Sequence, residues 1–170
     1  KRLATLAREA GVEHYVYTYV GSAHKRTGVP HFDNKWCIEE TVRGLRFPSH
    51  VILRPVFFME NLVAPYSLQG GTLASALGPG TKLQMIAVDD IGEFAALAFQ
   101  RPGHWKGRAV ELAGDELSMT ELAQAFSRMS GREVRYVQAP WDQFEQRAGR
   151  DVALMFRWFQ DVGFHVDIGA

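Results

Sequence analysis

The sequence has little cysteine, no net charge and no long apolar run. Its 170 residues include one cysteine, so no disulfide can form within the chain. The 19 Lys and Arg balance the 19 Asp and Glu, and the overall charge therefore gives no reason to expect a nucleic-acid or anionic-membrane partner. No apolar stretch approaches the ~20 residues that cross a bilayer, and the first residues lack the apolar block of a signal peptide. We therefore expect a cytoplasmic globular protein.

The sequence also lacks the phosphate-binding turn of a dinucleotide-binding sheet. Such a sheet begins with a strand, a glycine-rich turn and a helix whose N-terminus holds the pyrophosphate. The stretch "GPGTK", residues 78–82, has the glycines but is followed by a strand pattern instead of a helix. Either the chain binds no nucleotide, or the first half of its binding domain lies outside the sequence.

Helix and strand patterns alternate through the first third of the chain. Apolar residues at helical spacing predict a helix over residues 1–10, and β-branched and aromatic residues predict a buried strand over residues 12–22. A second helix, capped by Asp33 or Asn34, precedes a strand over residues 50–55. This order is typical of βαβ crossovers, which require a parallel sheet covered by helices on both faces.

The later residues continue the mixed pattern. Ser118 and Glu121 have the spacing of a helix capping box, and Gly131 is expected to end that helix. Asp89 or Asp90 is expected to cap the helix that follows residues 82–88. Strands are expected over residues 82–88, 108–114 and 133–138, and further helices after Pro140 and over residues 151–164.

Five segments in the same order resemble the NmrA-like proteins, atypical members of the short-chain dehydrogenase/reductase superfamily, and most closely their redox-sensor type. They are "REAGVEHYVYTYVGSA", "HFDNKWCIEETVR", "ILRPVFFMENL", "VDDIGEFAALAF" and "GRDVALMFRWF". The resemblance implies an α/β fold: the C-terminal part of a Rossmann-type, doubly wound and mostly parallel sheet, plus a smaller mixed lobe. It places the later Rossmann elements in residues 1–62 and the substrate- or partner-binding lobe in residues 63–170. Roughly residues 83–113 would pack back toward the sheet, and the N-terminal half with the glycine-rich loop would be missing.

The resemblance also implies a cofactor site for NADP, with NAD as the alternative. In such proteins the lysine matching Lys35 lies beside the nicotinamide ribose. The residues matching Phe58, Met59, Glu60 and Asn61 line the nicotinamide end of the cofactor. An ammonium on a helix can donate hydrogen bonds to ribose hydroxyls, which gives this implied role a physical basis. The alternative without a cofactor role is a solvated Lys35 that pairs with Glu39 one helical turn later.

The catalytic residues depart from the superfamily pattern. The reductase mechanism needs a tyrosine four residues before the lysine, but position 31 is His, and Ser22 is the candidate for the serine that orients the substrate. His31 could donate a proton, or it could be a loop histidine bonded to backbone. Together with His24 and Asp33 it matches no metal-ligand spacing, so we expect no metal site.

Two functions follow from the resemblance. The first is redox sensing, in which the protein responds to NADPH and NADP and acts through a regulatory partner protein. The second is an NADPH-dependent reductase acting on a quinone-like, carbonyl or phenolic substrate. A homodimer is compatible with both functions, whereas membrane and direct nucleic-acid partners are not expected.

Overall fold

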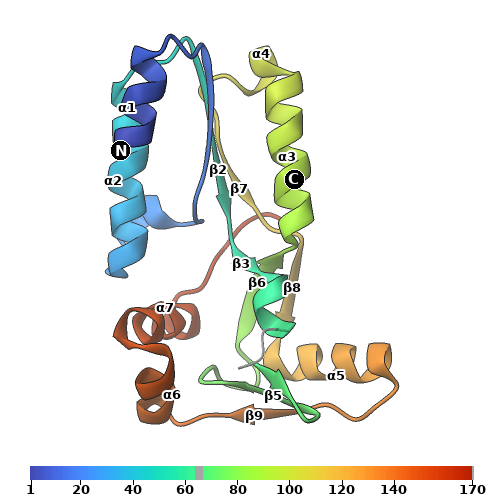
Figure 1. Ribbon diagram of the computed structural model, residues 1–170. Coiled ribbons are helices and arrows are strands. Elements are labelled where there is room, and N and C mark those ends of the chain that lie inside the picture. Colours follow the sequence, from blue (N-terminus) through green and yellow to red (C-terminus); the bar gives the residue numbers. More distant parts are fainter. Residues whose placement is uncertain (64–66, 170) are drawn as a thin grey trace. The chain divides into compact units, whose positions relative to one another are not determined.

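The computed structural model describes residues 1–63 and 67–169 (Figure 1). The chain divides into two compact units, and each is described by itself. Unit 1 comprises Lys1–Val56 and Val88–Leu112, and unit 2 comprises Phe57–Ala87 and Ala113–Ala170. The assignment of a cofactor-binding and a partner-binding role to separate parts of the chain stays a prediction. Among the described residues, every helix is too short or too polar to cross a membrane.

Unit 1 is built on a parallel three-stranded sheet. Its strands are β1 (His14–Thr18), β2 (Ser49–Pro55) and β7 (Ala109–Leu112), with β2 in the centre. Residues 51–53 of β2 are fully buried, as expected for a central strand that is covered on both faces. The parallel sheet predicted from the alternating pattern is confirmed, although β1 is shorter than expected.

Helices cover both faces of this sheet. Figure 1 shows α1 (Arg2–Glu9) and α2 (Pro30–Gly44) on one face, with α3 (Val88–Gln100) on the other. The short α4 (Pro102–Trp105) follows α3 and contacts β2. A 3-10 turn, η1 (Ala23–Lys25), lies between β1 and α2. Unit 1 is therefore a three-layer α/β structure.

Two predicted helix starts were wrong. Helix α2 begins at Pro30, with Val29 as N-cap, so neither Asp33 nor Asn34 caps it. Proline is favoured in the first turn because its missing N–H has no helical partner there. Helix α3 begins at Val88, which places both Asp89 and Asp90 in its first turn, where acidic groups interact favourably with the helix dipole.

Unit 2 contains two small mixed sheets. The first has the order β3 (Phe57–Phe58), β6 (Lys82–Ile86) and β8 (Asp115–Ser118). The second has the order β4 (Leu68–Gln69), β5 (Thr72–Ser75) and β9 (Arg135–Gln138). Strands β5 and β9 are parallel, whereas β6 and β8 are antiparallel.

The helices of unit 2 are η2 (Met59–Val63), α5 (Met119–Ser130), α6 (Trp141–Ala148) and α7 (Arg150–Asp161). The predicted capping box of α5 is confirmed: the Ser118 side chain accepts from the backbone N–H of Glu121, and the Glu121 side chain accepts from that of Ser118. Gly131 ends this helix with φ of 65°, a conformation that favours glycine. Helix α7 supplies Phe159, whose ring contacts those of Phe57 and Phe164 in the core.

Candidate functional site

The carboxyl ends of β1, β2 and β7 form the edge at which open α/β sheets bind ligands. The loop after β1 crosses this edge, because the backbone N–H of Gly21 donates to the Pro55 carbonyl at 2.7 Å. The backbone N–H of Ser22 then donates to Glu111 Oε1 of β7 at 2.6 Å. Ser22 has φ of 58°, a strained conformation for a residue with a side chain. These contacts fix the loop against two neighbouring strands.

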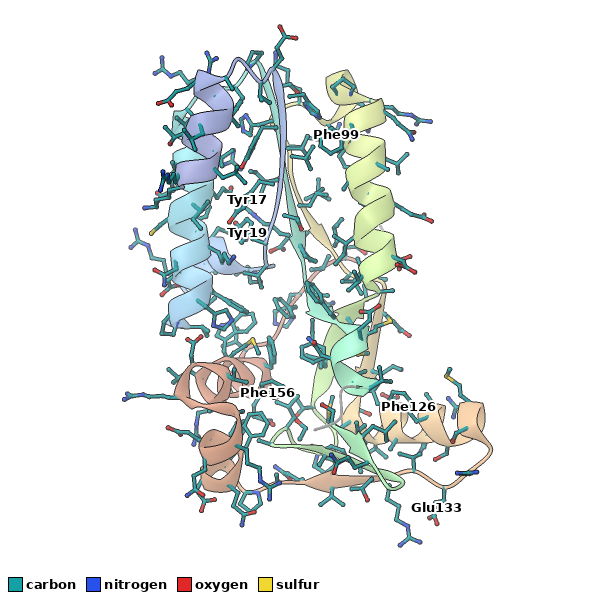
Figure 2. All side chains as sticks on the ribbon, in the orientation of Figure 1. Tyr17, Tyr19, Phe99, Phe126, Glu133 and Phe156 are labelled. Atoms are coloured by element: carbon teal, nitrogen blue, oxygen red, sulfur yellow. The ribbon has the colours of Figure 1, made fainter. Side chains whose placement is uncertain are left out.

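A buried carboxylate, Glu39, links α2 to the same sheet. Its side chain is fully buried and accepts two hydrogen bonds from Arg54 of β2, from Nη2 to Oε1 at 2.8 Å and from Nε to Oε2 at 3.1 Å. Arg43, one helical turn later, donates to Oε1 at 2.7 Å, and the Tyr19 hydroxyl donates to Oε2. Figure 2 shows Tyr17 on β1, and Tyr19 just after this strand, on the side that faces α2. The carboxylate is thus held by four hydrogen bonds from three side chains.

Burial and these contacts determine the protonation states of Glu39 and of the two tyrosines. Burial alone raises the pKa of Glu39, but hydrogen bonds from Arg54, Tyr19 and Arg43 outweigh burial and hold that pKa below its ordinary value. Burial and the bond to Glu39 raise the pKa of Tyr19, and burial raises the pKa of Tyr17 to about 12. Glu39 is therefore ionised and both tyrosines are neutral near neutral pH.

His24 lies at the exposed side of this network. Its Nδ1 is 3.1 Å from Arg54 Nη1, and its ring packs near that of Trp36 on α2. A guanidinium can only donate, so Nδ1 accepts and the neutral imidazole carries its proton on Nε2. Burial and the Arg54 charge lower the pKa of His24, although Glu111 opposes this shift. The His24 side chain is 34% exposed.

The structure places the predicted residues of unit 1 around this edge, but in different environments. Lys35 is exposed on the second turn of α2. A helix capped by Asp33 would have placed it on the first turn. Glu39 is occupied by Arg54, Arg43 and Tyr19, so the alternative of a Lys35–Glu39 ion pair is wrong. His31 is half-buried in the first turn of α2 and not in a loop, with its ring 4.8 Å from that of Phe32.

Ser22 differs from the expectation for a substrate-orienting serine. Its side chain is fully buried, and its hydroxyl has no hydrogen-bond partner among the described residues. A ligand could reach this hydroxyl only if the loop moved. The observed contact of Ser22 is made by its backbone N–H, which positions Glu111.

The remaining predicted residues belong to unit 2. Phe58 is the second residue of β3, and Met59, Glu60 and Asn61 lie in η2. Strand β3 is parallel to β6, with Phe58 opposite Ile86. The turn therefore follows the carboxyl end of a parallel strand, which is the expected position for a loop that lines a ligand.

Sequence reasoning missed the roles of Arg54, Glu39, Glu111 and His24. One signal was available, because Arg54 interrupts the apolar run "HVILRP" of a strand predicted to be buried. A buried arginine requires an acidic partner, which predicts a carboxylate on a covering element. The identity of that carboxylate follows only from the packing of α2 on β2.

The comparisons with known sequences agree on one family. The model of the NmrA-like family matches residues 1–169. The chain is 34% identical over 151 residues to the NAD(P)H azoreductase of Xenophilus azovorans, covering 85% of this chain and 50% of the relative. It is 30% identical over 155 residues to the nitrogen metabolite repression protein nmrA of Emericella nidulans, covering 82% of this chain and 44% of the relative. The chain thus spans about half the length of these relatives.

Solved structures support the same fold. The NADPH-dependent quinone oxidoreductase QOR2 of Escherichia coli, complexed with NADPH, matches 98% of this chain and 62% of that chain, with a TM-score of 0.79 and 25% identity. The negative transcriptional regulator Nmra in complex with NAD matches 88% of this chain and 53% of that chain, with a TM-score of 0.70 and 26% identity. The prediction of an α/β, Rossmann-type fold with a mostly parallel sheet is confirmed.

Proposed function

The chain belongs to the NmrA-like family, and we propose that it forms part of an NADP(H)-binding protein that acts as a redox sensor. The observation that carries this proposal is the polar network at the carboxyl edge of the unit 1 sheet, where ligands bind in open α/β sheets. Two structural relatives, a regulator and a reductase, were crystallised with NAD and NADPH respectively. NADP is the proposed cofactor, with NAD as the alternative.

In this proposal Lys35 contacts the nicotinamide ribose. Helix α2 follows the loop from the carboxyl end of β1, so its first turns lie toward the ligand-binding edge. Trp36, the neighbour of Lys35, packs near both His24 and the Arg54 guanidinium, which ties this turn of α2 to the network. The exposed Lys35 ammonium is then free to donate to ribose hydroxyls. Phe58, Met59, Glu60 and Asn61 are proposed to line the nicotinamide end.

The absence of the usual acid favours sensing over efficient turnover. Position 31 holds His in place of the tyrosine that protonates substrates in short-chain reductases. A sensor needs only to bind oxidised and reduced cofactor with different affinities, or to change conformation with them, and then to alter its contacts with a regulatory partner protein. The nmrA relative carries a repression function in its name, which agrees with a regulatory role.

A second candidate is an NADPH-dependent reductase, and the geometry of His24 favours it. Its proton lies on Nε2 because Arg54 occupies Nδ1, so Nε2 has an N–H that can donate a hydrogen bond to a carbonyl or quinone oxygen. A neutral imidazole of this kind can stabilise negative charge that develops on a substrate. We propose His24, in preference to His31, as the donor in any such reaction.

Steady-state NADPH oxidation by the natural full-length protein tests these two candidates. The protein is mixed with NADPH and a panel of quinones, and Lys35→Ala, His24→Gln and His31→Gln are compared with the wild type. The sensor proposal expects saturable NADPH binding with no turnover above background. Steady oxidation that is lost in Lys35→Ala and reduced about tenfold in His24→Gln, but unchanged in His31→Gln, would establish the reductase and overturn the sensor.

A further inference from the structure

Unit 2 contains an apolar cavity of about 470 Å³. This volume lies within the range of small-molecule pockets, ~300–1,000 Å³. Its walls come from β3, β5, α5, α6 and α7, so segments distant in the sequence meet around it.

Aromatic rings form one wall of the cavity. The Phe156 ring of α7 lies 4.8 Å from that of Phe144 on α6 and 6.1 Å from that of Phe57 on β3. Figure 2 shows Phe156 on α7, close to α6. Such a wall offers ring faces and edges to a flat ligand, and aromatic pairs prefer offset or edge-to-face contacts at these separations.

A second part of the cavity lining comes from the segment around β5. Leu73 and Leu77 belong to the segment around β5, and both are buried. The hydroxyl of Tyr136 on β9 donates to the Ser75 carbonyl at 3.1 Å, and the side chain of Gln138 donates to the Ala76 carbonyl at 3.2 Å. These bonds hold the backbone beside the cavity, so the space is part of the folded structure and does not simply close.

One charge borders this apolar space. Among the described residues that line it, Arg147 alone is charged. No carboxylate of the described residues lies within ion-pair distance of Arg147, whereas Arg135 pairs with Glu133. The nearby Arg157 also differs, because its guanidinium lies 4.6 Å from the centre of the Trp141 ring. Arg147 is therefore an exposed, uncommitted guanidinium at the rim of an apolar cavity.

We propose that this cavity binds an aromatic anion of about two fused rings, with the rings against Phe144 and Phe156 and the acid group on Arg147. A planar guanidinium pairs bidentately with a carboxylate or sulfonate, which fixes the orientation of the ligand. The apolar walls exclude long polar chains, and the single cation selects against aromatic cations. The lining also includes Asn61, which is proposed to line the nicotinamide end of the cofactor, so this inference deepens the proposed function and rests on it for the role of the ligand. Ligand binding is measured without NADPH, so its failure is distinguishable from a failure of cofactor binding.

The probes are 2-naphthoate and its neutral analogue 2-naphthamide, which share the same rings. Isothermal titration of each ligand into the natural full-length protein, without NADPH, gives the two affinities. We expect one site per chain and a preference of about tenfold or more for the anion, because pairs of opposite charge with direct hydrogen bonds are the stronger ones. Equal affinities, or no saturable binding of 2-naphthoate, would overturn the proposal.

Three variants locate the site. Arg147→Gln is expected to abolish the preference for the anion while retaining weak binding of both ligands. Arg150→Gln, a matched change at an exposed arginine outside the cavity lining, is expected to leave both affinities unchanged. Ala148→Trp fills the cavity and is expected to block both ligands. An equal loss of 2-naphthoate affinity in Arg150→Gln and Arg147→Gln would show nonspecific charge attraction and would contradict the proposed site. Because Arg147 is exposed, its replacement should not disturb folding.

Discussion

The two units of the chain are stabilised in different ways. Unit 1 is organised at the carboxyl edge of its sheet by a buried ion pair, Glu39 with Arg54, that also holds Tyr19 and His24. Unit 2 is organised by aromatic rings, including Phe156 and Phe159, and encloses an apolar cavity. A charged network in a low-dielectric site fixes geometry at a cost in desolvation, whereas ring packing tolerates a space that a ligand can fill. The difference indicates that polar groups are fixed precisely in unit 1, whereas unit 2 has a largely apolar space that we propose binds a ligand.

The largest effect is expected from breaking the ion pair of unit 1. Glu39→Leu leaves the Arg54 guanidinium buried without its carboxylate, and it should lower the free energy of opening in unit 1 by about 4 kcal/mol. Hydrogen exchange of the β1 and β2 amides measures this loss, with the β5 and β9 amides of unit 2 as an internal reference.

The double variant Glu39→Leu/Arg54→Leu is the control for this prediction. Because it removes both charges together, it should recover at least half of the lost protection in β1 and β2. A single Glu39→Leu variant with unchanged exchange would contradict the structural role assigned to the network.

Truncating a core side chain in unit 2 should lower the stability of that unit. Phe159 is buried and its ring contacts those of Phe57 and Phe164, so Phe159→Ala should cost about 3 kcal/mol through lost burial and a new cavity. The loss is measured by hydrogen exchange in β5, β6 and β9. Met129→Ala, at a side chain that is 83% exposed, is the matched control and should change nothing. Equal losses of protection in both units would show that the two do not open separately.

Acidification should affect unit 1 through Glu39. The folded state holds the pKa of this carboxyl below its ordinary 4.5, so its ionisation stabilises unit 1 above pH 4.5. That stabilisation is lost as the pH falls through the lowered pKa, so protection of unit 1 should decrease with falling pH. Hydrogen exchange of β1 and β2 amides from pH 5 downward measures the slope. In Glu39→Leu/Arg54→Leu the slope should be smaller, and an identical slope would assign the acid sensitivity to other groups.

The parts of the fold that depend on local sequence were predictable. The Ser118 and Glu121 capping box and the glycine at position 131 are recognised from neighbouring residues, and the structure contains both. The start of α2 was not predicted correctly, because the capping rule favours Asp33 or Asn34, whereas the helix begins at Pro30 without a side-chain cap. Strands β5 and β8 were missed because their sequences, TLAS and DELS, contain few β-branched or aromatic residues, whereas the equally short β9, RYVQ, contains Tyr and Val and was predicted.

The candidate site was predictable only in part. Lys35 was identified through its position in a family motif, not through its own physical surroundings. The bonds from Arg54 to Glu39, and from Ser22 to Glu111, join residues 15 and 89 positions apart. Such pairs depend on how helices and strands pack, which the spacing of residues along the chain does not determine. A charged residue within an apolar strand is the sequence signal that most directly indicates a buried polar network.

The affinity of the natural full-length protein for NADPH, measured by fluorescence titration in Lys35→Ala and Lys106→Ala, tests the central claim most directly. Lys106 is an exposed lysine that precedes β7, at the amino edge of the sheet, and provides a matched loss of charge. If NADPH lies at the carboxyl edge beside Lys35, the affinity should fall about tenfold in Lys35→Ala and remain unchanged in Lys106→Ala. Unchanged affinity in Lys35→Ala, or equal losses in both variants, would contradict the account.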